Sequence, residues 1–188
     1  PKIAKLDSVN FKQIISTEAT DVSAFSIESI ATDEDFIFAG DQYNNKILKI
    51  NKSTFTSFVS TYGSLGSGNS NFNFIGQIGI DETYLYVCDI KNHRVKVHKK
   101  DTLAFVRSFG QLGQHTTSFH LPMGLAVDGD GGVIYVANDG NYNILKLRKS
   151  DGSFIASANL DYDTFGEASL AVDEKYLYVA YRVIDKDS

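Results

Sequence analysis

The sequence predicts an all-β protein built from repeated four-stranded antiparallel units. The first observation is a short apolar pattern that ends in aspartate and occurs four times, at Asp33, Asp81, Asp128 and Asp173. The second is that the following runs are short and rich in β-branched and aromatic residues, which favour strands. The third is that no segment keeps a helical period. Four-stranded units that repeat every 40 to 50 residues or so are typical of a β-propeller.

Each unit is expected to contain four strands, a to d, separated by turn residues such as Asp33-Glu34-Asp35 and Ser150-Asp151-Gly152. Strand a precedes each aspartate, in the segments Ser29–Asp33, Gln77–Asp81, Gly124–Asp128 and Ser169–Asp173. Strand b is expected at Phe36–Ala39, Leu85–Cys88, Ile134–Ala137 and Leu177–Ala180. Strand c is expected at Ile47–Ile50, Val95–His98 and Ile144–Leu147. Strand d is expected at Phe55–Val59, Leu103–Phe109 and Phe154–Ser157.

The repeats indicate that the 188 residues form a single domain, or part of one. Residues 26–74, 75–122 and 123–166 are three full repeats. Residues 1–25 resemble strands c and d of a blade, and residues 167–188 resemble strands a and b. Two arrangements stay open: the half-blades pair and close a four-bladed ring, or the chain is a fragment of a larger propeller, for example one of six blades. The missing initiator methionine favours the fragment.

Strand a is expected to be innermost, because each copy carries a small residue at its centre: Ala31, Gly79, Ala126 and Ala171. We expect these residues to lie close to the propeller axis. The residues that precede them point the other way, so Ile30, Ile78, Leu125 and Leu170 should be almost fully buried between blades. Cys88 is expected to be a small core residue, and His98 a surface or inter-blade residue.

Two sets of polar residues are expected to hold turns. Asp33, Asp81, Asp128 and Asp173 can accept backbone N–H groups in the a–b turns. The b–c turns share an Asp/Asn-x-x-Asn pattern, in which the paired members are Asp41 with Asn44, Asp89 with Asn92, and Asn138 with Asn141.

The candidate binding residues lie on one predicted face. Antiparallel topology puts the b–c turns and the d–a connections at the same end of every blade, and loops on a rigid scaffold are where binding residues concentrate. We call this end the loop face. Its candidate contact residues are Tyr43, Asn45, Lys46, His93, Arg94, His115, His120, Tyr142 and Asn143. Changing His93 and Arg94 to alanine is expected to leave stability nearly unchanged, because both are taken as surface residues.

The repeat resembles the NHL repeat. The matching pattern has three parts, which are quoted from two repeats. The strand-a part is Gly124-Leu125-Ala126-Val127-Asp128, and the b–c turn is Asn92-His93-Arg94-Val95. The connection to the next repeat contains Gly110-x-x-Gly113 and Phe119-x-x-Pro122. Residues 75–122 match best. Residues 167–188 match only across strands a and b, because Tyr181–Ile184 replaces the Asp-x-x-Asn turn. The resemblance implies a propeller that acts as a binding platform. Some relatives in this superfamily are lyases with His and acidic groups around the central channel, but the innermost positions here are Ser29, Gln77, Gly124 and Ser169.

Composition restricts the function classes. The net charge of −5 argues against a dedicated nucleic-acid binder, even though residues 91–107 are locally basic. One cysteine rules out an internal disulfide and a multi-cysteine zinc site, and His115 and His120 have no acidic or cysteine ligand between residues 111 and 122. We expect no cofactor, no catalytic residue and no membrane span. The sequence leaves the compartment and the oligomeric state open; an extracellular location would follow if a signal peptide has been removed.

The sequence therefore favours a non-enzymatic binding or scaffolding propeller that contacts a protein or a carbohydrate through its loop face. The alternative is a lyase-type enzyme whose catalytic groups lie on blades outside this chain.

Overall fold

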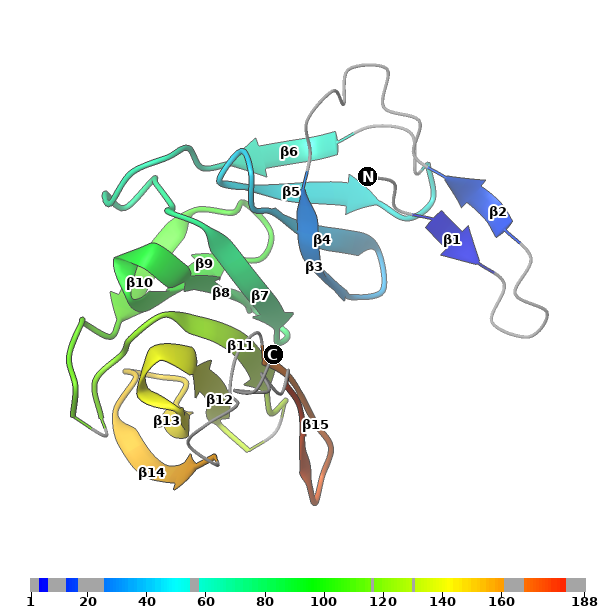
Figure 1. The fold of residues 1–188 in the computed structure, drawn as a ribbon. Helices are drawn as coiled ribbons and strands as arrows, with labels where there is room; N and C mark the ends of the chain where they lie inside the picture. Colours follow the sequence, from blue (N-terminus) through cyan, green and yellow to red (C-terminus); the bar gives the residue numbers. More distant parts are fainter. Residues whose placement is uncertain are drawn as a thin grey trace, which may run out of the picture.

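The structure is a computed structural model. It describes the backbone of residues 4–6 and 13–16, and residues 26–54, 58–115, 117–129, 131–160 and 168–181. Within these ranges the strands form three four-stranded sheets and two two-stranded sheets, and every strand pairing is antiparallel. Figure 1 shows the sheets following one another around an arc. The predicted all-β fold with four-stranded blades is confirmed.

The three complete blades follow the sequence in order. The first blade contains β3 (Ile27–Thr32), β4 (Phe36–Asp41), β5 (Lys46–Asn51) and β6 (Phe58–Tyr62). The second contains β7 (Ile75–Ile80), β8 (Tyr84–Asp89), β9 (Arg94–Lys99) and β10 (Phe105–Phe109). The third contains β11 (Pro122–Val127), β12 (Val133–Asn138), β13 (Asn143–Arg148) and β14 (Phe154–Asn159). The only helical segments in the described part are the short 3₁₀ turns η1 (Ile90–Asn92) and η2 (Asp139–Asn141).

The two remaining sheets are half-blades. They consist of β1 (Ala4–Leu6) with β2 (Gln13–Ser16), and β15 (Ser169–Val172) with β16 (Leu177–Ala180). Each strand pairs only within its own two-stranded sheet, and Figure 1 shows the two hairpins well apart. The closed four-bladed ring, one of the two predicted arrangements, is therefore not formed by the described strands.

Strand d of the first blade differs from its predicted place. It occupies Phe58–Tyr62, where the sequence predicted Phe55–Val59. The register of the preceding strand explains the difference, because Ile47 pairs with Tyr62 and Ile50 pairs with Phe58. Residues 55–57 lie outside the described ranges.

The innermost strands are β3, β7, β11 and β15, which contact one another in that order. Three apolar cores lie between successive blades. The first contains Phe38, Phe72 and Ile78, the second Tyr86, Val97 and Leu125, and the third Ala126, Ile144 and Leu170. Full burial of one such aliphatic side chain contributes about 1.5–3 kcal/mol. The blades are therefore held to one another mainly by apolar packing.

The sequence predicted that the small residues of strand a lie close to the axis. In the structure they point at the next blade. A Cβ atom added to Gly79 would approach Cγ2 of Val127 to 2.6 Å and Cδ2 of Leu125 to 3.5 Å. Each small residue therefore leaves room for the large residue of the following innermost strand. Leu170 is buried by this packing, whereas Ala171, on the other side of β15, is exposed.

Ile30 departs from the predicted burial. Ile78, Leu125 and Leu170 are at most 4% exposed, as expected, but Ile30 is 52% exposed. These positions are buried by the small-residue side of the preceding blade, and no described strand covers that side of β3. The prediction that Ile30 would be buried is wrong for the described part of the chain.

Hydrogen bonds also join the innermost strands near the axis. In each of β3, β7 and β11 the register of pairing with strand b of the same blade shifts. The Ile78 N–H donates to Ser29 Oγ at 3.0 Å, and the Leu125 N–H donates to Gln77 Oε1 at 2.9 Å. The third blade has Gly124 at the corresponding position and cannot supply such an acceptor. The Leu170 N–H instead donates to the same Gln77 oxygen at 3.0 Å.

The a–b turn aspartates accept backbone N–H groups. Asp81 Oδ1 accepts from the Thr83 and Tyr84 N–H groups at 2.9 and 2.8 Å. Its other oxygen accepts from the Tyr86 hydroxyl at 2.9 Å and lies 3.3 Å from Lys149 Nζ on the third blade. Burial raises the pKa of Asp81, but these hydrogen bonds outweigh it, and the pKa lies below its usual value. Asp33, Asp128 and Asp173 accept backbone N–H groups of their own turns in the same way.

Candidate functional site

The loop face begins where each strand b ends in a buried polar residue. Asp41, Asp89 and Asn138 have no exposed surface. Asp89 Oδ1 accepts from the Asn73 N–H at 2.8 Å, and Asn138 Oδ1 accepts from the His120 N–H at 2.6 Å. Each acceptor therefore fixes the last part of the d–a loop that leads into its own blade.

The turn asparagines point toward backbone groups. Asn92 Nδ2 donates to the Gly66 carbonyl at 2.8 Å, and Asn141 Nδ2 donates to the Gly113 carbonyl at 3.0 Å. Gly66 and Gly113 occupy the same position in successive d–a loops. Asn44 Nδ2 donates to Asp41 Oδ2 at 2.8 Å, and Asn92 Nδ2 donates in the same way to Asp89 Oδ2 at 2.9 Å. The Asp/Asn-x-x-Asn pattern thus links the b–c turns to the long loops beside them.

Arg94 is part of this scaffold. Its Nε lies 2.7 Å from Asp89 Oδ2, and its Nη2 donates to the Gly68 carbonyl at 3.0 Å. Lys96, which is fully buried, donates from Nζ to the carbonyls of Asn69 and Asn71 at 2.6 and 2.9 Å. Burial lowers the pKa of Lys96 to about 8. Two cations of the second blade therefore hold residues 68–71.

The sequence-predicted contact residues divide by exposure. Tyr43 is 71% exposed, and Tyr142 and His115 are also exposed. Lys46, His93, Arg94 and His120 are half-buried, while Asn45 and Asn143 are buried. Asn45 Oδ1 accepts from the Phe74 N–H, and Asn143 Oδ1 accepts from Asn138 Nδ2. The exposed members are those that can contact a partner without moving the scaffold.

Sequence reasoning missed two leucines on this face. Leu65 is 67% exposed and Leu112 is 60% exposed. They occupy the same place in the two d–a loops, within Gly63-Ser64-Leu65-Gly66 and Gly110-Gln111-Leu112-Gly113. Each lies in a bridge to the buried aromatic residue that closes its loop, Leu65 with Phe72 and Leu112 with Phe119. The repetition of leucine in a glycine-rich, solvent-facing loop was the available signal.

A depression of about 740 Å³ opens beside the axis on this face. Gln77 and Ser29 line its inner part, and Phe74, Leu121 and Met123 line its walls. Lys91 and Glu28 bring opposite charges to the same depression, and Lys91 Nζ lies 3.6 Å from the centre of the Phe74 ring. The depression thus presents polar and apolar surface in similar measure.

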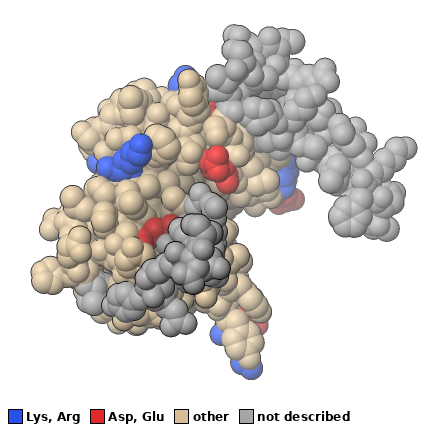
Figure 2. Space-filling view, in the orientation of Figure 1, with Lys and Arg blue, Asp and Glu red and all other residues tan. Residues whose placement is uncertain are grey.

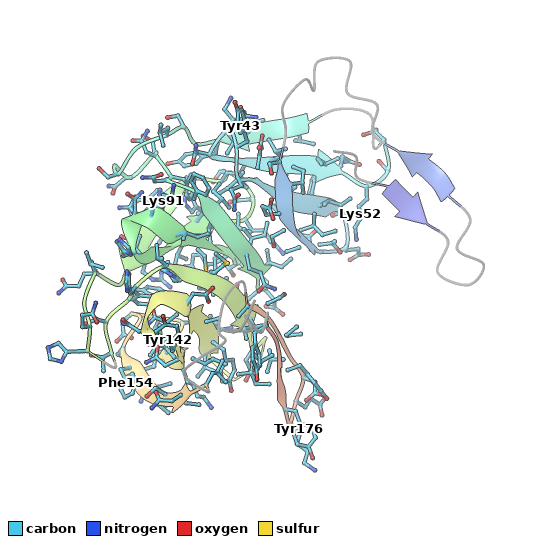
Figure 3. The ribbon with its side chains drawn as sticks, viewed as in Figure 1. Tyr43, Lys52, Lys91, Tyr142, Phe154 and Tyr176 are labelled. Carbon is cyan, nitrogen blue, oxygen red and sulfur yellow. The ribbon has the colours of Figure 1, made fainter. Side chains whose placement is uncertain are left out.

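The exposed side chains come from several blades. Figure 3 shows Tyr43, Lys91 and Tyr142 on three successive blades, with Tyr176 at the tip of the β15–β16 hairpin. In the view of Figure 2 the described surface is mostly uncharged, and its Lys, Arg, Asp and Glu residues form only small separate patches. Among the described residues, no three His, Cys, Asp or Glu side chains are grouped closely enough to hold a metal ion. Nor does any described helix have the length and apolar character to cross a membrane.

Comparison with solved structures identifies the architecture. The chain superimposes on the structure of U3-55K with a TM-score of 0.64 at 13% identity, covering 84% of this chain and 52% of that chain. The RRP9 WD40 repeats give a TM-score of 0.64 at 12% identity, covering 84% of this chain and 51% of that one. The chain has a β-propeller fold. It spans about half the length of these two propellers.

A third propeller-type neighbour is the glutaminyl cyclase of Myxococcus xanthus. The TM-score is 0.61 at 12% identity, and the match covers 98% of this chain and 83% of that one. No protein-family model matches the sequence, and no curated protein matches it. At these identities the likeness concerns the fold alone.

Proposed function

We propose that this propeller is a protein-binding module of the NHL type, and that its loop face is the contact surface. The observation that carries the proposal is the repeated exposure of Leu65 and Leu112 on loops held by many hydrogen bonds. Exposed apolar groups that cluster on one face mark interaction sites. Loops held in one conformation also lose little conformational entropy on binding.

A protein partner fits this surface better than a carbohydrate or a nucleic acid. Tyr43 and Tyr142 suit both protein and sugar contacts, but exposed leucines offer aliphatic area and no hydrogen bonds. Nucleic-acid binding rests on cationic contacts to phosphate. On the loop face Arg94 is already paired with Asp89, and Lys91 lies over Phe74 beside the acidic Glu28.

The lyase alternative has less support. It requires a group of acidic or histidine side chains near the axis, and among the residues of the described innermost strands only Glu28 is of these types; it lines the depression together with Ser29, Gln77 and Ser169. Both polar atoms of the Gln77 side chain are engaged by backbone groups of β11 and β15. The likeness to a glutaminyl cyclase is a likeness of fold.

The proposal is tested by comparing two variants in quantitative affinity purification followed by direct binding measurement. The loop-face variant combines Tyr43→Ser, Leu65→Ser and Leu112→Ser. The control is Tyr176→Ser, which removes a similarly exposed aromatic side chain from an a–b turn at the opposite end of the blades. A partner protein should lose at least about tenfold in affinity with the loop-face variant, the effect of anchor residues, and none with the control. Equal binding by both variants would contradict the proposal.

A further inference from the structure

The junctions between blades contain a repeated contact at the loop face. Asn45 and His93 occupy the same position in successive b–c turns, and both have left-handed backbone conformations, with φ of 56° and 53°. The Phe74 N–H donates to Asn45 Oδ1 at 2.8 Å, and the Leu121 N–H donates to His93 Nδ1 at 3.1 Å. Phe74 and Leu121 are themselves equivalent. We call this contact the junction latch.

The two latches differ in their response to protons. A backbone N–H can only donate, so Nδ1 of His93 must present its lone pair and the ring must be neutral, with its proton on Nε2. A protonated imidazole carries N–H groups at both nitrogens and cannot accept from Leu121. The carboxamide of Asn45 does not titrate in this range. The first junction therefore has a latch of constant strength, whereas the second depends on one protonation step.

The surroundings of His93 favour the neutral ring. The His120 ring lies 5.6 Å away, and its Nδ1 lies 3.1 Å from the Gly140 carbonyl, to which it can only donate. Burial and the neighbouring His120 lower the pKa of His93, while Asp89 acts in the opposite direction. Other ionisable groups on the packed elements are Lys91 and Arg94 on its own turn, and His115 and Asp139 on the third blade.

We propose that His93 is a proton-operated latch between the second and third blades. In the neutral form it holds the d–a loop at Leu121. On acidification the ring becomes a donor, the loop is released at that point, and the junction loosens on the loop face. The junction between the first and second blades, held by Asn45, does not respond. This proposal does not depend on the identity of any binding partner.

Amide hydrogen exchange at two equivalent residues tests the latch within one molecule. The protection of the Leu121 amide, corrected for its intrinsic exchange rate, should fall at least fivefold or so between about pH 7.5 and about pH 5, as expected for loss of one hydrogen bond. The protection of the Phe74 amide should not change. Parallel behaviour of the two amides would overturn the proposal.

Exchanging the two latch residues provides the matched control. His93→Asn gives the second junction the acceptor of the first, so protection of Leu121 should become independent of pH. Asn45→His should transfer the pH dependence to Phe74. If Leu121 keeps its pH dependence in the His93→Asn protein, another group is responsible and the proposal is wrong. Because each variant copies a residue already used at the equivalent position, both are expected to fold.

Discussion

Gln77 on the second blade hydrogen-bonds both backbone groups of Leu170, which lies 93 residues further along the chain on β15. Its Nε2 donates to the Leu170 carbonyl at 3.0 Å, and its Oε1 accepts from the Leu170 N–H at the same distance. The same oxygen accepts from Leu125, so one side chain joins three innermost strands. Gly124 lets β15 approach closely, because a Cβ atom at this position would lie 2.5 Å from the carbonyl oxygen of Ala168.

Gln77→Ala should therefore lower the free energy of unfolding by about 3 kcal/mol, since it leaves three backbone groups without their partner. Ser29→Ala removes a single acceptor, that of the Ile78 N–H, and should cost about 1 kcal/mol. Urea unfolding of both variants checks the order of the two effects. A Gln77→Ala protein no less stable than Ser29→Ala would show that the side chain does not join the blades.

Packing of the small residues predicts a second contrast. Ala126 is 5% exposed and faces the core that contains Leu170. Ala126→Leu should overpack this junction and cost about 1–3 kcal/mol. Ala171→Leu places the same side chain at the equivalent but exposed position of β15, and should change the free energy of unfolding by less than about 0.5 kcal/mol. Equal effects at both positions in thermal or urea unfolding would count against this packing.

The repeat spacing was sufficient to predict the strands, because turn residues and alternating apolar residues are local signals. Burial of a side chain, in contrast, is not determined by the local sequence. Ile30 has the same sequence context as Ile78, yet one is exposed and the other buried, because burial depends on which sheet lies against the strand. The direction of the small residues was missed for the same reason: it depends on how neighbouring blades interlock, as between Gly79 and Val127.

The pairing of Arg94 with Asp89 changes the expectation for the loop face. Arg94→Ala removes the cation from a carboxylate that has no exposed surface, so it should lower the free energy of unfolding by about 2 kcal/mol, less than for a fully buried pair. The sequence alone predicted almost no effect, because it treated Arg94 as a surface residue. Urea unfolding of the single variant decides between the two expectations.

The third blade supplies the control for this prediction. It has Asn138 and Asn143 where the second blade has Asp89 and Arg94, and Asn138 Nδ2 donates to Asn143 Oδ1 at 2.9 Å. The double change Asp89→Asn with Arg94→Asn should therefore be more stable than Arg94→Ala, because it replaces an unpaired charge by a neutral pair. A double variant that is the less stable of the two would show that the ion pair is not interchangeable with amides.

His98 should make the protein sensitive to acid. It is fully buried beside Tyr62, Phe72 and Phe105, and burial lowers its pKa to about 4. The unfolded chain binds this proton near its ordinary pKa of about 6.5, so stability is fully present above that pH and is lost as the pH falls toward 4. The loss attributable to His98 is about 3 kcal/mol.

His98→Leu, which copies Leu147 of the third blade, tests this expectation. The variant loses the contact of Nδ1 with the Leu103 carbonyl but should be much less sensitive to pH between about 6.5 and about 4. Urea unfolding at several pH values in this window gives the comparison. An undiminished pH dependence in the variant would assign the acid sensitivity to other groups.

Sequence reasoning identified only some of the candidate contact residues. That reasoning favoured positions that differ between repeats, because shared positions were taken as scaffold. It thereby selected Arg94 and Asn45, which hold backbone groups and carboxylates, and passed over Leu65 and Leu112, which are shared and exposed. Whether a loop residue faces its neighbours or solvent depends on side-chain direction, and the repeat pattern does not contain that information.

The most direct test of a binding loop face is the footprint of a bound partner protein, measured by hydrogen–deuterium exchange. Protection should appear in the loops that carry Tyr43, Leu65 and Leu112, because these side chains are exposed and their loops are held by the scaffold. The a–b turns that follow Asp33 and Asp81, at the opposite end of the blades, should exchange as in the free protein. Protection confined to those a–b turns would contradict the account.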